Sequence, residues 1–234
     1  MERIWIGIDF SSNRKQWNPG VKRSNIWIAT LHERRGEIHL VSPIRPHELM
    51  GEQSPFDRLC KFLRASDFDA AAIDAPFSVP QEYLPAGGHE ELIRAAKTQA
   101  MVTPPFPDAK WLVAYAASIR PLDERKPYRA SERDCNVNVR STLWAGPRGG
   151  AAFTAACLTL ISKSGRPCWP WAASQRGVLV EAFPSAQLRK WHMPYQGYGK
   201  PESSAAREEI LSSIGLRFQL KATSKNPLYA GVEF

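Results

Sequence analysis

Three acidic residues, Asp9, Asp74 and Glu181, each follow a run of apolar residues. Carboxylates in such positions are seldom fully buried unless they are paired or bind a metal. Clustered carboxylates repel each other, and a divalent cation relieves that repulsion; their oxygen atoms suit Mg²⁺ or Mn²⁺. Such ions activate water and stabilise the leaving oxygen in phosphodiester cleavage. We therefore expect these three residues to be the metal ligands and catalytic residues of a Mg²⁺- or Mn²⁺-dependent centre.

A structural role is the alternative for each acid. An aspartate at a strand end often caps the turn or helix that follows. Glu181 in particular can form an ion pair with an arginine. The sequence leaves these alternatives open.

Basic and aromatic residues are frequent in the second half of the chain and suit a nucleic-acid partner. Arginine guanidinium groups match the geometry of phosphate, and aromatic rings stack on unpaired bases. The predicted nucleic-acid contacts are Arg129, Arg133, Arg140, Arg148, Lys200 and Arg207, and the candidate stacking residues are Tyr128, Trp144, Trp169 and Trp171. Alternatively, the arginines pair with the nearby acids Asp123, Glu124, Glu132 and Asp134, and the tryptophans pack against the sheet.

Alternating apolar residues predict three consecutive strands at 4–10, 26–31 and 37–41, with a turn at Arg35-Gly36 between the last two. Their short connections predict an antiparallel meander. A helix is expected over 54–63, because Ser54 is a favourable N-cap and Pro55 a favourable first residue. The run 69–74 then predicts a fourth strand, parallel to the first and ending at Asp74.

The segment 77–176 interrupts this regular order and is rich in proline. Helices are expected near 90–99, 108–118 and 151–163, the last closed by Gly165. A fifth strand is predicted at 178–184, and a final helix over 201–214 ending at Gly215. We interpret the chain as one α/β domain over 1–234 with a large, mostly helical insertion at about 77–176. The five-stranded sheet is mixed: strands one to three are antiparallel, and strands four and five run parallel to strand one.

Five segments, in order along the chain, resemble motifs of domain-of-unknown-function family 429, regarded as predicted RNase H-like nucleases. They are Gly7-Ile8-Asp9-Phe10-Ser11, Ala72-Ile73-Asp74-Ala75-Pro76-Phe77-Ser78-Val79-Pro80, Arg129-Ala130-Ser131-Glu132-Arg133-Asp134-Cys135, Val180-Glu181-Ala182-Phe183-Pro184-Ser185 and Arg207-Glu208-Glu209-Ile210-Leu211. The resemblance implies an RNase H-like fold and metal-binding roles for Asp9, Asp74 and Glu181. The C-terminus departs from the family pattern, because no Asp-Ala-x-Asp-Ala motif is present and Pro227 and Gly231 disfavour a helix that would carry Glu233.

Composition limits the classes of protein that remain. The 234 residues are 43% hydrophobic and 23% charged, which is typical of a globular protein, and the net charge of +8 favours phosphate-bearing partners. No apolar run is long enough for a transmembrane helix, and the first residues do not resemble a signal peptide. The four cysteines, Cys60, Cys135, Cys157 and Cys168, form no CxxC pair, so we expect neither a disulfide framework nor a zinc site. Free cysteines favour the cytoplasm.

Three functions follow from these patterns. The first is a metal-dependent nuclease that hydrolyses phosphodiester bonds in DNA or RNA. The second is a catalytically degenerate RNase H-like module that binds nucleic acid or protein. Separately, a homo-oligomer or a partner protein is a candidate for completing the C-terminal part. The third is an actin-like ATPase-type phosphotransferase, because Gly7-Ile8-Asp9-Phe10-Ser11-Ser12 resembles the first motif of that group.

Overall fold

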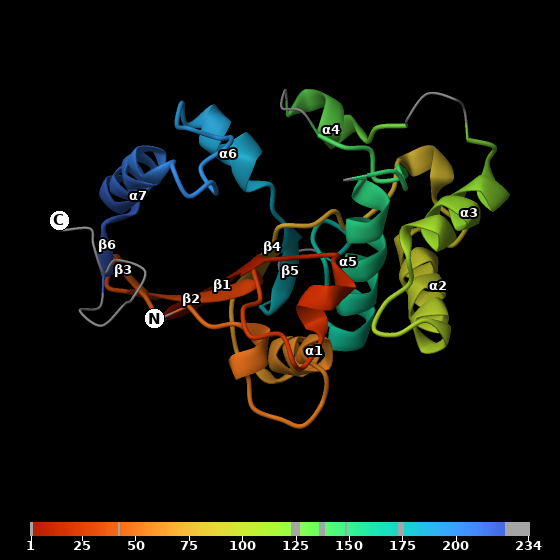
Figure 1. Cartoon of the computed structure of the whole chain (residues 1–234), viewed down its shortest axis with the longest axis horizontal. Helices are drawn as coiled ribbons and strands as arrows, with labels where there is room; N and C mark the ends of the chain where they lie inside the picture. The colour runs from red at the N-terminus through yellow and green to blue at the C-terminus, as the bar shows by residue number, and fades with distance from the viewer. Residues whose placement is uncertain are drawn as a thin grey trace.

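The computed structural model describes residues 2–41, 43–122, 127–135, 139–147, 149–172 and 176–222. The centre of the fold is a mixed β-sheet, in which the strands lie in the order β5-β4-β1-β2-β3-β6 (Figure 1). The strands are β1 (Arg3–Asp9), β2 (Trp27–Arg34), β3 (Glu37–Leu40), β4 (Ala70–Ile73), β5 (Val178–Glu181) and β6 (Leu220–Ala222). β1, β2 and β3 are antiparallel, whereas β4 and β5 run parallel to β1. This arrangement confirms the predicted sheet and adds β6, which pairs with β3 in parallel.

Local sequence explains the meander and the helix after it. Arg35 and Gly36 both have positive φ angles, 53° and 82°, as a tight two-residue hairpin between β2 and β3 requires. The helix α1 (Pro55–Ala65) begins where it was predicted, because the Ser54 side chain accepts a hydrogen bond from the Asp57 N–H at 3.2 Å. Its apolar side, which includes Leu59, is buried against the sheet.

The predicted helices between β4 and β5 are confirmed as α2 (Gly88–Val102), α3 (Ala109–Ile119) and α5 (Gly150–Ser164). Gly165 ends α5 with a φ of 67°, as expected of a glycine at this position. A short helix, α4 (Ala130–Asp134), lies between α3 and α5. α5 contacts α1 beside the sheet, and α2 and α3 pack on α5 from the far side (Figure 1). Three short 3₁₀ helices are η1 (Arg14–Trp17), η2 (Pro46–Glu48) and η3 (Gln81–Tyr83).

Two predictions for the C-terminal part were wrong. The fifth strand stops at Glu181, and α6 (Pro184–Lys190) begins at Pro184, a favourable first helical residue. The last helix, α7 (Ser204–Phe218), passes through Gly215 and ends at Gln219. An interior glycine costs only about 1 kcal/mol, so the tertiary context of the helix that leads into β6 can override it.

The two faces of the sheet carry different helices. α1 lies below the sheet in Figure 1, and α6 and α7 lie above it. Ile6, Ile8 and Ile73 point into the main core with α1 and α5. Because successive side chains of a strand alternate, Gly7 and Asp9 of β1 point to the α6 and α7 side. Within the described residues, every helix is too short or too polar to span a bilayer.

The core predicts a large difference between two identical substitutions. Leu59 is fully buried in α1, whereas Leu216 of α7 is 85% exposed. Leu59→Ala is expected to lower the free energy of unfolding by about 2–5 kcal/mol, and Leu216→Ala by less than about 0.5 kcal/mol. Urea unfolding followed by circular dichroism measures both. Equal losses would contradict the assignment of this core.

Candidate functional site

The pairing of β1 with β4 brings Asp9 and Asp74 together. The strands run parallel with Ile8 opposite Ile73, and the main-chain N–H of Asp74 donates to the Ile8 carbonyl oxygen at 3.0 Å. Asp9 and Asp74 directly follow Ile8 and Ile73 in the chain. Because successive side chains of a strand point to opposite faces, both acids point away from the face that carries these two isoleucines. The two carboxylates therefore lie near each other at the carboxyl edge of the sheet, a common place for ligands in α/β proteins.

The strand positions next to the two carboxylates carry small residues. Gly7 lies opposite Ala72 in the register, and a methyl group added at Gly7 would meet no atom within 4 Å. Large side chains in these positions would fill the space beside the two carboxylates. The sequence thus leaves room for a ligand at this point.

Burial and mutual repulsion disfavour the charged form of this pair. Burial raises the pKa of Asp74 to about 6, and the negative charge of Asp9 adds to the rise. Partial burial also raises the pKa of Asp9, although the residue as a whole is exposed to solvent. Within the described residues, neither carboxylate has an ion pair or a hydrogen bond that would offset this cost. The pair thus has the electrostatic character of a cation site.

Tyr198 lies close enough to this pair to feel its charge, and the sequence did not single it out. Burial raises the pKa of the Tyr198 hydroxyl, a hydrogen bond with Ser185 opposes the rise, and the charges of Asp74 and Asp9 add to it. Arg207 of α7 holds the loop by donating to the carbonyl oxygens of Tyr198 at 2.8 Å and Lys200 at 2.6 Å. The only signal in the sequence was the glycine on each side of Tyr198, which marks a turn.

Glu181 does not join Asp9 and Asp74. It lies opposite Ile73 in the register, so it points to the same side of the sheet as the buried Ile73, toward α5. There the Arg129 guanidinium donates to both of its carboxylate oxygens, at 2.7 and 2.6 Å. The Phe77 N–H donates a further hydrogen bond at 2.9 Å. The pairing of Glu181 with an arginine, left open by the sequence, is the arrangement observed.

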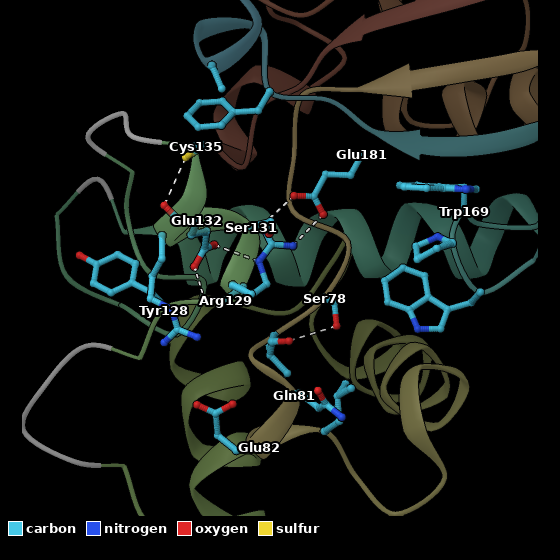
Figure 2. A pocket seen from close by; sticks show the side chains of 18 residues that line it. Ser78, Gln81, Glu82, Tyr128, Arg129, Ser131, Glu132, Cys135, Trp169 and Glu181 are labelled. Atoms are coloured by element: carbon cyan, nitrogen blue, oxygen red, sulfur yellow. Dashed lines mark hydrogen bonds and ion pairs between the residues drawn. The ribbon is translucent and has the colours of Figure 1, made fainter. Parts of the chain in front are cut away.

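Arg129 also links Glu181 to the helix α4. Its Nε–H donates to Glu132 at 3.0 Å, and its main-chain N–H donates to the same carboxylate at 2.9 Å. Burial raises the pKa of Glu132, while the charge of Arg129 opposes that rise. One cation thus holds two carboxylates and ties α4 to the end of β5 (Figure 2).

A pocket of about 860 Å³ opens beside this ion pair. Its wall includes Tyr128 and Arg133 near α4, Ser78 and Gln81 after β4, and Trp169 before β5. Figure 2 shows Tyr128 and Trp169 at opposite sides, with the Arg129–Glu181 pair between them. Its volume is within the range of small-ligand sites.

The remaining predicted nucleic-acid contacts are scattered. Arg133 is exposed at this pocket, and Arg140 is exposed with one hydrogen bond to the Pro147 carbonyl oxygen at 3.2 Å. Lys200 is exposed on the loop that Arg207 holds. Arg148 and the C-terminal residues Pro227, Gly231 and Glu233 lie outside the described residues.

The chain belongs to the family described as Protein of unknown function (DUF429), whose model matches residues 7–231. The match covers all three acidic residues and the whole of the sheet after the first part of β1. No curated protein and no solved structure matches the chain.

Asp74→Asn is expected to stabilise the protein at neutral pH. The folded-state pKa of about 6 exceeds the ordinary 3.8, so the folded protein binds more protons between these values, and wild-type stability falls as the pH rises through this window. The rise in pKa corresponds to at most about 3 kcal/mol in the free energy of unfolding. Because Asp74 is partly exposed, the expected gain in stability from Asp74→Asn is about 2 kcal/mol. Chemical unfolding at about pH 4 and pH 7.5 tests this: the gain should be present at the higher pH and nearly absent at the lower.

The control for this measurement is Asp67→Asn, the same change at a side chain that is 77% exposed. It should leave stability within about 0.5 kcal/mol at both pH values. A gain for Asp74→Asn that persisted at about pH 4 would contradict the explanation.

Arg129→Met is expected to destabilise the protein by about 3 kcal/mol, because Glu132 and Glu181 lose their shared cation in a largely buried place. Arg129→Lys should recover only part of the loss, since lysine cannot bind a carboxylate through two parallel hydrogen bonds. The matched control is Arg34→Met, which removes a surface pair with Glu2 and should cost less than about 1 kcal/mol. Equal losses at Arg129 and Arg34 would rule out the anchoring role.

Proposed function

We propose that the protein is a Mg²⁺- or Mn²⁺-dependent nuclease in which Asp9 and Asp74 hold the ion. One observation carries the proposal: two carboxylates lie side by side at the carboxyl ends of parallel strands, and no cationic side chain among the described residues neutralises them. A charged pair of this kind costs stability unless a ligand compensates it. A divalent cation is the ligand that suits two carboxylates best.

The donor set fits magnesium better than a metal that needs a protein cage. Within the described part of the chain, no three metal-binding side chains come together. Mg²⁺ commonly retains several water molecules and binds through one or two carboxylates and the phosphates of its substrate. When bound, the ion supplies positive charge for the phosphate oxygens and activates water for attack on phosphorus.

The protein itself orients the substrate around this point. Asp9 and Asp74 present oxygen atoms from two rigid strand ends, and the small residues Gly7 and Ala72 keep the adjoining floor open. The Tyr198 hydroxyl feels the charge of both carboxylates and is a candidate donor to a phosphate oxygen bound beside them. Arg133 of α4 is exposed at the pocket that Glu181 also lines, and its guanidinium suits a phosphate of the same strand. The net charge of +8 favours the approach of nucleic acid.

The pairing of Glu181 with Arg129 favours a second candidate function. An acid expected to bind metal is instead held by an arginine through two hydrogen bonds. A protein that has lost part of its metal site in this way would be a nucleic-acid-binding module without catalysis. Asp9→Asn would then leave nucleic-acid binding unchanged, and the wild-type protein itself would not cleave nucleic acid.

We also propose that the protein works in the cytoplasm. The four cysteines are free, and Cys60, Cys157 and Cys168 are buried. Unpaired thiols are common in a reducing compartment, whereas secreted proteins commonly pair theirs.

The test uses labelled single-stranded DNA, duplex DNA, branched DNA and RNA, each with Mg²⁺, Mn²⁺ or EDTA. The wild-type protein should cleave at least one substrate with Mg²⁺ or Mn²⁺ and none in EDTA. Asp9→Asn and Asp74→Asn should each lower the rate about 100-fold or more, because a bound cation contributes several kcal/mol to the transition state. Asp67→Asn, at an exposed carboxylate, serves as the matched control and should cleave normally.

Thermal melting gives a second readout that does not depend on turnover. Mg²⁺ or Mn²⁺ should raise the melting temperature of the wild type and of Asp67→Asn, because a ligand that binds only the folded state stabilises it. The rise should be absent from the Asp9→Asn/Asp74→Asn double variant. A folded wild type that neither cleaves nor responds to metal, yet binds nucleic acid as tightly as the double variant, would establish the binding module instead.

A further inference from the structure

Exposed aromatic side chains gather at one place on the protein. Among the described residues, the aromatic side chains with the largest exposure are Trp169 at 56%, Trp171 at 47%, Phe218 at 38% and Phe183 at 37%. All of these except Phe218 line the pocket beside the Arg129–Glu181 pair. Apolar rings left in water at a concave site commonly mark a binding surface.

Contacts with the rest of the protein hold the main chain at Trp169 and the ring of Trp171. The main-chain N–H of Trp169 donates to the Leu179 carbonyl oxygen of β5 at 2.9 Å, and the main-chain N–H of Leu179 donates to the Pro167 carbonyl oxygen at 2.8 Å. The Trp171 ring stacks on His89, with ring centres 3.5 Å apart and planes 7° from parallel. The His89 Nε2–H in turn donates to the Phe77 carbonyl oxygen at 2.7 Å. These contacts fix the main chain at Trp169 and the ring of Trp171, and they leave the Trp169 ring exposed to solvent.

The pocket continues into a second hollow of about 830 Å³ along α6. The two share Cys135, Glu181, Phe183 and Ala186, so they form one groove along the carboxyl edge of β5. The second hollow adds two basic residues, Arg189 and Lys190, and one acidic residue, Asp134. Lys190 is exposed, and among the described residues it has no ion-pair partner. The groove thus has the aromatic rings and the exposed Arg133 in its first part, and Arg189 and Lys190 in its second part.

We propose that this groove binds single-stranded nucleic acid, with an unpaired base stacked on Trp169 and the backbone following Arg133, Arg189 and Lys190. Aromatic platforms combined with a basic groove are the arrangement that binds single strands with little sequence preference. In a duplex, the faces of the bases are covered by their neighbours, so a ring such as Trp169 has nothing to stack on. Strand binding in this groove deepens the proposed nuclease function. The direction in which the strand runs past Asp9 and Asp74 rests on that proposed function.

Acceptor groups in the pocket suit a base better than a phosphate. The wall carries the carboxylates of Glu82, Glu132 and Glu181, together with the hydroxyl groups of Ser78 and Ser131. Glu132 and Glu181 share Arg129 as their cation. A phosphate here would meet negative oxygen atoms, whereas the amino groups of adenine, cytosine and guanine can donate hydrogen bonds to them. The aromatic end is therefore the base site, and the basic end is the backbone site.

Fluorescence anisotropy with a labelled single-stranded oligonucleotide and its duplex, both in EDTA, tests the proposal without cleavage. Wild-type protein should bind the single strand about tenfold or more tightly than the duplex. Trp169→Ala should weaken single-strand binding about 5- to 150-fold, the range expected for one lost base–aromatic stack. Trp169→Phe should retain most of the affinity, and Leu216→Ala, at an exposed apolar residue outside the groove, should bind as the wild type. Circular dichroism and melting confirm that each variant is folded.

A second variant tests the basic end of the groove. Lys190→Gln should reduce the slope of log affinity against log salt by about 0.7 for single strands, as expected for one lost phosphate contact. Trp169→Ala should leave this slope unchanged, since stacking releases no counterions.

The outcomes separate this proposal from the proposed catalysis. Single-strand preference that depends on Trp169, without any cleavage, would support the groove and refute the nuclease. Cleavage that depends on Asp9 and Asp74, with Trp169→Ala binding single strands as the wild type does, would overturn the groove and leave the nuclease intact. Equal affinity of the wild type for duplex and single strand, or no binding to either, would also overturn the groove.

Discussion

The parallel pairing of β1 with β4 is the constraint on which the rest of the site depends. One main-chain hydrogen bond, from the Asp74 N–H to the Ile8 carbonyl oxygen, sets the two acidic residues on adjacent strand ends. The helix α1 returns the chain between these strands and is held by a buried apolar side. The apolar burial of this crossover therefore contributes free energy that offsets the repulsion between the carboxylates of Asp9 and Asp74.

Side-chain alternation divides the acidic edge of the sheet into two centres with different chemistry. Asp9 and Asp74 point toward α6 and α7, whereas Glu181, which pairs with Ile73, points toward α5 and the helices between β4 and β5. A shift of one residue in the register of β5 would reverse this choice. The first centre lacks a cation among the described residues, and the second carries its own in Arg129.

The ion pair at the second centre also explains how the groove keeps its shape. Arg129 ties α4 to the end of β5, and the Phe77 main chain connects that pair to His89 and hence to Trp171. The walls of the groove thus come from segments far apart in the sequence but joined by a continuous polar network. Buried networks of this kind specify one arrangement because each unpaired member would be costly.

The sequence alone determined much of the sheet and of the helices. Apolar alternation placed β1 to β3, short apolar runs placed β4 and β5, and Ser54, Pro55 and Gly165 marked helix ends whose chemistry is local. Asp9 and Asp74 could be paired in advance, because parallel strands joined by a helical crossover end at the same edge. The prediction for α7 failed at Gly215, where the local preference of one glycine was outweighed by tertiary context.

Only the tertiary structure decided the partner of Glu181 and the position of Tyr198. Both depend on residues far apart in the chain. Arg129 and Glu181 are 52 residues apart. Tyr198 interacts electrostatically with Asp9, at the end of β1, and with Asp74, just after β4. Strand register determines which side of a sheet an acid faces, and it is set by the packing of the whole sheet rather than by the residues next to that acid. A pattern in the sequence can therefore name the acids of this protein, but the assembled sheet decides which of them share a site.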